Sequence, residues 1–290
     1  MTPTNAPRDA AVADSAAPPT GPGDPVGRAA YLAWARTWAA AAAISPLDGD
    51  EVEERVMDLF HRLCRRVQPA FALEIGAHEA SFSQWAVAEL PGVRSLAFEA
   101  NPYVHEKYAD RLHAAGVDYR NVAVAPASGE VELHLPLEVA GKTRTLTSRM
   151  ASLAHHVRAA DSTSVTVPAV RLDEEPALLG EGRLVAWIDV EGANEAVLRS
   201  GADVLDRTDV LYLEVEDDLT WEGQWLDHHA AAHLRDHGLI PVARDTKRTH
   251  QYNVVFVRAE LAANERVARE VARLQRFRKR GPADEAETSS

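Results

Sequence analysis

Hydrophobic residues follow two spacings along this chain, and these spacings predict the order of its strands and helices. Short apolar runs indicate buried strands, whereas apolar residues three or four positions apart indicate amphipathic helices. From residue 71 onwards the two patterns alternate. Strands are predicted at 71–75, 94–98, 117–124, 130–135, 164–170, 183–188, 209–215, 240–243 and 252–258. Helices are predicted near 80–90, 103–115, 172–179, 193–200, 224–237 and 259–278.

This alternation favours an α/β fold with a doubly wound, mostly parallel sheet. Parallel neighbours need a crossover connection, and the crossover helices cover both faces of the sheet. Only a short loop joins the last two predicted strands, so the sheet is expected to carry an antiparallel edge. Residues 138–162 show neither pattern clearly and are predicted to form a loop-rich insertion.

Two helices are predicted ahead of the first strand, at 28–44 and at about 50–67. The first carries Tyr31, Trp34 and Trp38 at helical spacing. Together the two helices form an N-terminal helical extension. The aromatic stripe suits the core or a contact between two copies of the chain, and a lid over substrate is the less favoured alternative. A homodimer through these helices is therefore one expectation.

The chain is predicted to divide into four segments. Residues 1–27 and 281–290 contain almost no large apolar side chains. Such segments cannot bury enough surface to offset the entropy lost on ordering, so both are predicted to be disordered. Residues 28–67 form the helical extension, and residues 68–280 form the α/β domain.

Composition excludes several classes of protein. Of the 290 residues, 46% are hydrophobic, which suits a globular domain, and the net charge of −13 argues against a broad nucleic-acid-binding face. The single cysteine, Cys64, excludes an internal disulfide and a cysteine-based zinc site. No long apolar run predicts a membrane span, and no signal-peptide pattern opens the chain. A cytoplasmic location is the resulting expectation.

Acidic residues stand at the carboxyl ends of the first two predicted strands. Glu74 precedes a turn at Gly76, and Glu99 follows 25 residues after Glu74. Ligands of open α/β sheets bind at these strand ends. An acid there accepts hydrogen bonds from ribose hydroxyls, and a glycine turn lets the backbone approach the ligand. The pattern predicts a site for an adenosine-containing cofactor.

The residues around the turn favour S-adenosylmethionine over a dinucleotide. A dinucleotide site has the pattern GxGxxG, but residues 76–81 read GAHEAS and keep only the first glycine. Glu74 and Glu79 would repel a pyrophosphate, whereas an acid suits a cofactor with an ammonium and a sulfonium. An NAD-dependent oxidoreductase is disfavoured for the same reason. The remaining alternative is that Glu74 and Glu99 are merely solvated strand ends.

Several segments of the chain resemble FkbM-type S-adenosylmethionine-dependent methyltransferases. They lie in the family's order between residues 70 and 258, and the most specific is the block around IDVEGA; they read ALEIGAHEASFS, LAFEANPYVHEKYADRL, VAVAPASGEVELHLP, TVPAVRLDE, AWIDVEGANEAVLRSGADVL, VLYLEVE and YNVVFVR. The resemblance implies a Rossmann-like class I methyltransferase fold with a seven-stranded sheet. It also implies methyl transfer, mostly onto oxygen atoms of natural products or sugars.

The resemblance also implies roles for individual positions. It places the methionine part at Glu74, Gly76 and His78, the ribose at Glu99, the adenine at Ala123 and Val124, and the methyl group at Asp189 and Glu191. Ala77, Ala100 and Asn101 are expected in the cofactor site as well. The family turn usually reads D-V-G-A-N-x-G. Here Glu74 keeps the charge of the aspartate, while His78 replaces the asparagine and Ala80 the second glycine.

Two routes for activating an acceptor hydroxyl are open. Asp189, Asp217 and Asp218 lie at or just past two successive strands, and their oxygens suit Mg²⁺, which would lower the pKa of the hydroxyl. The acidic residues could instead form a solvated loop. The metal-free route uses a histidine as base: His155 or His156, in the insertion that the resemblance places over the substrate.

Other residues have alternative interpretations. His250 precedes the last predicted strand and could also reach the cleft. Trp221 and Trp225 could line an acceptor pocket or pack on the sheet.

The expected function is O-methylation of a small-molecule natural product or sugar. The alternatives are N-methylation of a small molecule or peptide, and a non-catalytic adenosine-binding or scaffold protein.

Overall fold

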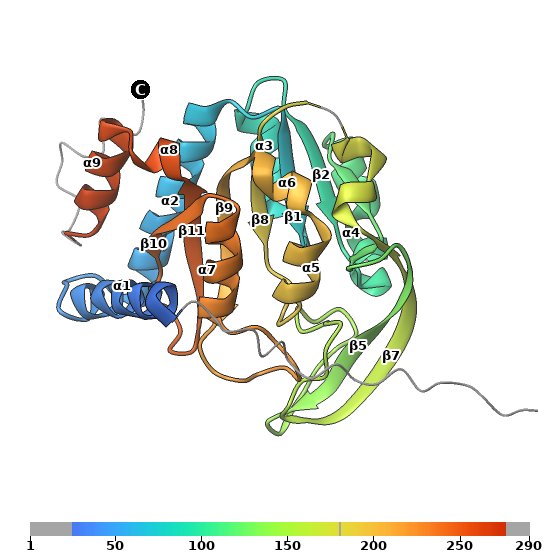
Figure 1. The fold of residues 1–290 in the computed structure, drawn as a ribbon. Coiled ribbons are helices and arrows are strands. Elements are labelled where there is room, and N and C mark those ends of the chain that lie inside the picture. Colours follow the sequence, from blue (N-terminus) through green and yellow to red (C-terminus); the bar gives the residue numbers. More distant parts are fainter. Residues whose placement is uncertain (1–24, 180, 277–290) are drawn as a thin grey trace, which may run out of the picture.

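The computed structural model of this protein describes residues 25–179 and 181–276 (Figure 1). Most of the predicted disordered segments, 1–27 and 281–290, lie outside the described residues. Residues 25–27 are the exception, because helix α1 (Pro25–Ala43) already begins at Pro25. Proline suits the first turn of a helix, where its missing N–H would have no partner.

A seven-stranded sheet forms the centre of the fold, in the order β10-β11-β9-β8-β1-β2-β3. The strands are β1 (Phe71–Ile75), β2 (Arg94–Phe98), β3 (Asp118–Arg120), β8 (Leu184–Ile188), β9 (Thr208–Glu216), β10 (Leu239–Arg244) and β11 (Gln251–Arg258). The first five pair in parallel, whereas β11 runs antiparallel to β9 and β10. The predicted fold class, a mostly parallel sheet with an antiparallel edge, is confirmed.

Helices cover both faces of this sheet (Figure 1). On one face lie α2 (Gly49–Val67), α3 (Ser81–Glu89), α4 (Pro102–Ala114) and α9 (Glu265–Leu274). On the other lie α5 (Asn194–Ser200), α6 (Ala202–Arg207) and α7 (Asp227–Asp236). The predicted helix 259–278 is broken: the short α8 (Ala259–Ala262) ends first, and the side chain of Asn264 then caps the start of α9. Residues 172–179 form two 3₁₀ turns, Leu172–Glu174 and Pro176–Leu178.

The aromatic stripe of the N-terminal extension packs inside the protein. Helix α1 lies against α7 and β10 at the edge of the sheet. Tyr31 joins the apolar core on the α7 side, while Trp38 joins the core on the α2 side. The stripe therefore contributes to the core, and a homodimer through these helices stays a prediction.

A second sheet holds the long hairpin that extends below the main sheet in Figure 1. It contains β4 (Ala123–Val124), β5 (Gly129–Val139), β6 (Lys142–Thr143) and β7 (Ala159–Val170). The prediction of one strand at 117–124 was wrong, because the chain passes from the first sheet to the second at Asn121. The amide of Asn121 donates to the carbonyls of Glu99 and Ala100 and holds this bend.

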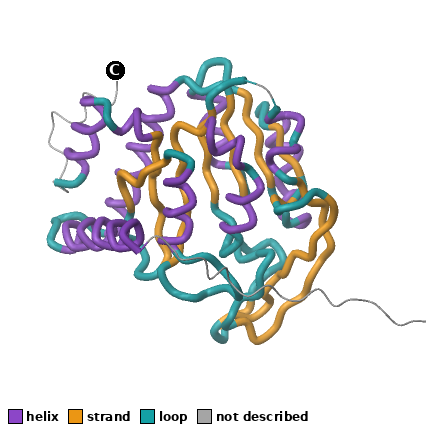
Figure 2. Tube along the Cα trace, in the orientation of Figure 1, coloured by secondary structure: helices purple, strands orange, loops and turns teal. Residues whose placement is uncertain are grey.

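No helix among the described residues is both long and apolar enough to cross a membrane. Figure 2 shows where the loops gather: between the lower ends of the strands and the hairpin. These are the carboxyl ends of the parallel strands, where open α/β sheets bind ligands.

Candidate active site

A cavity of about 1030 Å³ lies at the carboxyl ends of the central strands. Its wall includes the ends of β1, β2, β8 and β9, part of the insertion, and the loop between β10 and β11. Pockets for single small ligands measure roughly 300–1,000 Å³. The cavity is therefore large enough for a nucleoside cofactor and a second small molecule.

The turn after β1 packs directly on the end of β8. Gly76 has a φ of +75°, and a Cβ there would lie 1.7 Å from the carbonyl oxygen of Asp189. The N–H of Asp189 also donates to the carbonyl of Ile75. Only glycine fits this position. His78 and Ala80 follow with φ values of 45° and 53°, the left-handed region that favours asparagine and glycine.

Glu99 lines the cavity with a carboxylate that two backbone groups hold in place. The N–H of His78 donates to Oε2 and the N–H of Asn101 donates to Oε1, each across 2.7 Å. A carboxylate oxygen can accept two hydrogen bonds, so each oxygen keeps one position for a ligand hydroxyl. Burial raises the pKa of Glu99 to about 7, although both hydrogen bonds act to lower it.

Glu74 also lines the cavity, and its carboxylate caps the first turn of α3. The N–H of Ser83 donates to Oε2 across 2.7 Å, and that of Phe82 lies 3.4 Å from Oε1. Burial raises the pKa of Glu74 to about 7, against the lowering effect of these bonds. Glu74 is thus fixed beside the glycine turn by the N-terminus of a helix.

The structure places most of the other predicted cofactor residues in the cavity wall. Gly76, Ala77, His78, Ala100, Ala123 and Val124 all line it. Asn101 does not. Its side-chain oxygen caps α4 by accepting the N–H of Tyr103, and its amide donates to the carbonyl of Leu146 in the insertion. Asn101 therefore holds the surrounding structure together instead of lining the cavity.

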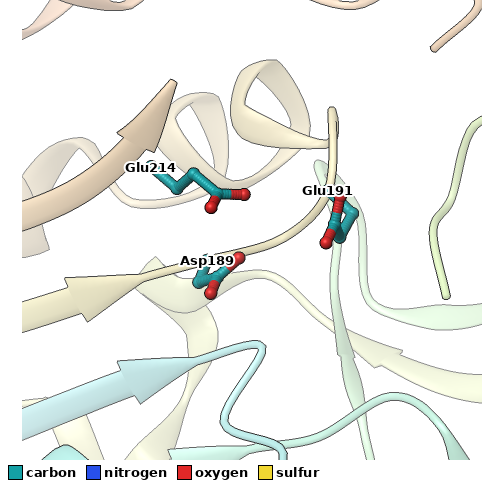
Figure 3. A group of neighbouring side chains, drawn as sticks. All are labelled: Asp189, Glu191 and Glu214. Atoms are coloured by element: carbon teal, nitrogen blue, oxygen red, sulfur yellow. The ribbon is translucent and has the colours of Figure 1, made fainter. Parts of the chain in front are cut away.

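Three carboxylates converge on the cavity wall: those of Asp189, Glu191 and Glu214 (Figure 3). One oxygen from each lies within 4.8 Å of the others. Gln251 donates its amide to Glu214 across 2.7 Å and to Glu191 across 3.5 Å. Burial raises the pKa of all three carboxyls, and the charge of Asp189 raises those of Glu191 and Glu214 further.

Sequence reasoning did not assign Glu214 to this group. The signal was present, because Ile188 of β8 pairs with Leu213 of β9, so that the next residues, Asp189 and Glu214, are neighbours. The sequence alone does not show how β8 and β9 align, so this pairing could be used only once the structure was known.

The predicted magnesium ligands are not brought together. Asp217 and Asp218 are exposed and lie outside the cavity wall, because β9 continues to Glu216 before the chain turns away. Asp218 accepts the N–H of Leu219. The Oδ1 of Asp217 lies 2.8 Å from Nδ1 of His250, and it is His250 that lines the cavity.

The predicted bases, His155 and His156, also lie outside the cavity wall. His155 is exposed and stacks on His134 with a centroid distance of 3.7 Å. His156 is buried against Trp221, and its Nδ1 accepts the N–H of Arg158 across 3.0 Å. Both positions depend on the course of the insertion, which the sequence pattern leaves open.

Trp221 and Trp225 pack inside the protein, in agreement with one of the two interpretations. Trp221 is fully buried, and its side chain lies where a Cβ at Gly192 would be. Trp225 joins the core beside α7, with the guanidinium of Arg199 5.0 Å from its ring.

Other aromatic side chains line the end of the cavity toward α2 and α3. Trp187 and Tyr212 stack with ring centroids 4.0 Å apart, and His61 stacks on Trp85 at 3.9 Å. The hydroxyl of Tyr212 is buried and has no hydrogen-bond partner among the described residues. This end of the cavity therefore offers mainly aromatic ring faces.

The family model described as the FkbM methyltransferase domain matches residues 74–241, more than half of the chain. No curated protein sequence matches the chain.

The solved structures similar to this chain include a TehB-like SAM-dependent methyltransferase from Corynebacterium glutamicum, with 11% identity, coverage of 81% of this chain and 100% of that chain, and a TM-score of 0.38. Precorrin-6y C5,15-methyltransferase from Geobacter metallireducens is 16% identical. The match covers 70% of this chain and 87% of that chain, with a TM-score of 0.38. The N-terminal domain of EvdMO1, in the presence of SAH and D-fucose, is 14% identical. The match covers 73% of this chain and 83% of that chain, with a TM-score of 0.38. From the match to its family model, this chain belongs to the FkbM family of S-adenosylmethionine-dependent methyltransferases.

Proposed function

We propose that this protein methylates a hydroxyl group of a small molecule, of the natural-product or sugar type. The observation that supports the methyl-donor part of this proposal most directly is the carboxylate of Glu99. Two backbone N–H groups orient it at the end of β2, and each oxygen keeps one acceptor position beside a turn that only glycine can form. This arrangement suits the two hydroxyls of a ribose.

The residues beyond Glu99 suit the rest of S-adenosylmethionine. This donor supplies an electrophilic methyl group on a positively charged sulfur. Glu74 and the turn at Gly76 would hold the methionine part, and Ala123 and Val124 the adenine. Asp189 and Glu191 would lie near the sulfonium, where a negative field favours a cation over a pyrophosphate.

In this proposal His250, which from the sequence could also reach the cleft, acts as the base instead of His155 or His156. Its ring lines the cavity, and Asp217 holds its Nδ1 across 2.8 Å. A carboxylate in this position fixes the ring and stabilises the imidazolium that forms when the other nitrogen takes a proton. In this proposal Asp217 acts through His250, and neither Asp217 nor Asp218 binds magnesium.

The aromatic end of the cavity would receive the acceptor. Trp187 and Tyr212 offer a stacked pair of rings, and Met57 of α2 lies on the same cavity wall. Such a surface suits the face of a ring. The same surface would accept an amine, so N-methylation remains the second candidate.

The donor assignment is tested by calorimetry with S-adenosylmethionine and S-adenosylhomocysteine. We expect both to bind, and we expect Glu99→Gln to weaken binding at least about tenfold because hydrogen bonds to a charged group are lost. Glu106→Gln, at an exposed position of α4, is the matched control and should bind normally.

If neither compound binds at millimolar concentration, the donor assignment and the enzyme are both wrong, and a scaffold role remains. If the protein binds S-adenosylhomocysteine but no methylated product forms with a panel of sugars, phenols and amines, the non-catalytic alternative gains support.

A further inference from the structure

We propose that Arg144 binds a carboxylate of the acceptor, so that the natural acceptor is a hydroxy acid, such as a phenolic acid or a sugar acid. The proposal rests on the proposed function, because it concerns the acceptor of the same methyl transfer. It adds a negative charge to a substrate class that the aromatic end of the cavity leaves open.

The guanidinium of Arg144 lies in the cavity wall without a partner. Arg144 follows β6 and is half-buried, and its backbone N–H donates to the carbonyl of Leu137 across 2.7 Å. Among the described residues, no hydrogen bond or ion pair reaches its side chain. Nε is buried without an acceptor, whereas neither terminal nitrogen is buried in this way. The side chain is thus held against the protein, and its outer nitrogens stay open to a ligand.

The other basic side chains of the wall have partners. Within residues 25–179 and 181–276, the wall contains three further lysine or arginine side chains, and each contacts an oxygen of a neighbouring side chain. These contacts are Arg149 with Glu79, Lys247 with Glu53, and Arg248 with Gln251. Arg144 therefore brings a positive charge that no side-chain contact neutralises. A charge in a partly enclosed site is stabilised most by a charge of opposite sign.

The neighbours of Arg144 place it on the acceptor side of the cavity. Burial lowers the pKa of His156, and the charges of Arg158 and Arg144 lower it further, so Arg144 lies near His156. His156 forms an isolated β-bridge with Trp221, and the adjacent Thr220 lines the cavity. This segment follows β9, which β8 separates from β1 and β2. The donor would lie at the ends of β1 and β2, so the side of β9 remains for the acceptor.

A hydrogen bond holds the same insertion beside the place proposed for the methyl group. The hydroxyl of Ser152 donates to the carbonyl of Glu191 across 2.6 Å, and both residues line the cavity. An acceptor whose hydroxyl lies near the methyl group is therefore in contact with the insertion that carries Arg144.

The charges of the wall indicate which anion Arg144 would bind. A planar guanidinium binds a carboxylate through two parallel N–H···O bonds. The wall also contains Asp189, Glu191 and Glu214. These acids would repel a doubly charged phosphate about twice as strongly as a singly charged carboxylate at the same distance. A carboxylate is therefore favoured over a phosphate.

The test is calorimetric titration of matched acids and esters into the full chain with S-adenosylhomocysteine bound. The acids are 4-hydroxybenzoic acid, 4-hydroxyphenylpropionic acid and glucuronic acid, each compared with its uncharged methyl ester. We expect at least one acid to bind at least about tenfold more tightly than its ester, because the ester cannot form a charged pair. Arg144→Gln should abolish this preference. Arg144→Lys should keep part of it, since lysine keeps the charge but not the paired N–H groups.

Arg158→Gln is the matched control. Arg158 belongs to the same insertion and its charge also acts on His156, but it is exposed and lies outside the cavity wall. This variant should keep the preference for the acid. Arg144→Gln removes a charge that has no partner in the protein, so it should fold as well as the parent, which circular dichroism checks.

The proposal is overturned if no acid binds more tightly than its ester, or if Arg144→Gln keeps the preference of the parent. The donor carries a carboxylate of its own, so S-adenosylhomocysteine is titrated into the same variants. We expect Arg144→Gln to bind it normally. A loss of at least about tenfold in Arg144→Gln but not in Arg158→Gln would mean that Arg144 holds the donor, and the acceptor assignment would be wrong.

The two proposals fail in different ways. If S-adenosylhomocysteine does not bind the parent, the donor is wrong, and the acids are titrated into the free protein to judge the carboxylate site by itself. If an acid binds through Arg144 and no methylated product forms with S-adenosylmethionine, only the methyl transfer is refuted.

Discussion

The backbone N–H of His78 donates to Oε2 of Glu99 across 2.7 Å. This bond joins the turn after β1 to the end of β2, the two segments that would hold opposite parts of the cofactor. It also orients the carboxylate before any ligand binds, so less conformational entropy is lost on binding.

The affinity for S-adenosylhomocysteine should depend on pH through Glu99. Its pKa in the folded protein is about 7, above the value of 4.5 for a free glutamate. The ionised carboxylate is the better acceptor for ribose hydroxyls, so affinity should rise from about pH 6 and level off above about pH 8. Calorimetry in buffers of different ionisation enthalpy should detect proton release near pH 6.

The same pKa shift has an opposite effect on stability. Between pH 4.5 and about 7 the folded protein binds more protons at Glu99 than the unfolded chain does. The free energy of unfolding should therefore fall as pH rises through this window, and Glu99→Gln should reduce the slope. A slope that is unchanged in this variant would contradict the assignment.

Two glycines with the same backbone angle test the close contact between β1 and β8. Gly76 and Gly92 both have a φ of +75°, but a Cβ at Gly92 meets nothing within 4 Å. Gly92→Ala should cost about 1 kcal/mol, the strain of a left-handed alanine. Gly76→Ala should cost at least about 3 kcal/mol, because the carbonyl of Asp189 cannot give way. Urea denaturation of both variants measures the difference, and equal losses would rule out the contact.

The buried hydroxyl of Tyr212, which has no hydrogen-bond partner among the described residues, should lower the free energy of unfolding of the protein without ligand. Tyr212→Phe removes a buried polar group that has no partner, so the free energy of unfolding should rise by about 1 kcal/mol. Tyr252 is the matched control, because its hydroxyl donates to Asp227. Tyr252→Phe should lower the free energy of unfolding by about 1–3 kcal/mol. Thermal denaturation compares the two, and a stability loss in both would mean that Tyr212 has a partner.

Methyl transfer should depend on His250 and not on His155. His250→Gln should lower kcat by roughly 10²–10⁴-fold, the usual contribution of a general base. Asp217→Asn should have a smaller effect of the same kind, since it removes the group that orients the ring. His155→Ala should leave kcat unchanged because His155 lies outside the cavity wall. Loss of activity in His155→Ala alone would restore the original prediction.

The bounds of β1 and β2 and the two glutamates near their carboxyl ends could be predicted from the sequence because the signals are local. Each short apolar run ends at an acid, and the strands β1 and β2 have the predicted bounds, 71–75 and 94–98. The bend at Asn121 could not be predicted, because it depends on carbonyls that lie some 20 residues earlier in the chain.

The sequence also could not predict which acidic residue of β9 lies beside Asp189. Asp217 and Glu214 are three residues apart, and both are acids near the end of a strand. Only the register of β9 against β8 decides that Glu214 lies beside Asp189. His155 and His156 lie in the connection 144–158 between β6 and β7, whose sequence has no helical or strand period that would predict its path.

Three contacts join the insertion to the turn after β1 and to the start of α4. The amide of Asn101 holds the carbonyl of Leu146, Arg149 pairs with Glu79, and the ring of His78 lies 3.4 Å from the carbonyl of Thr147. Asn101 and His78 are the two residues whose N–H groups orient Glu99. A displacement of the insertion would therefore also move the two residues that orient the Glu99 carboxylate, so the affinity for the cofactor should depend on how firmly the insertion is held.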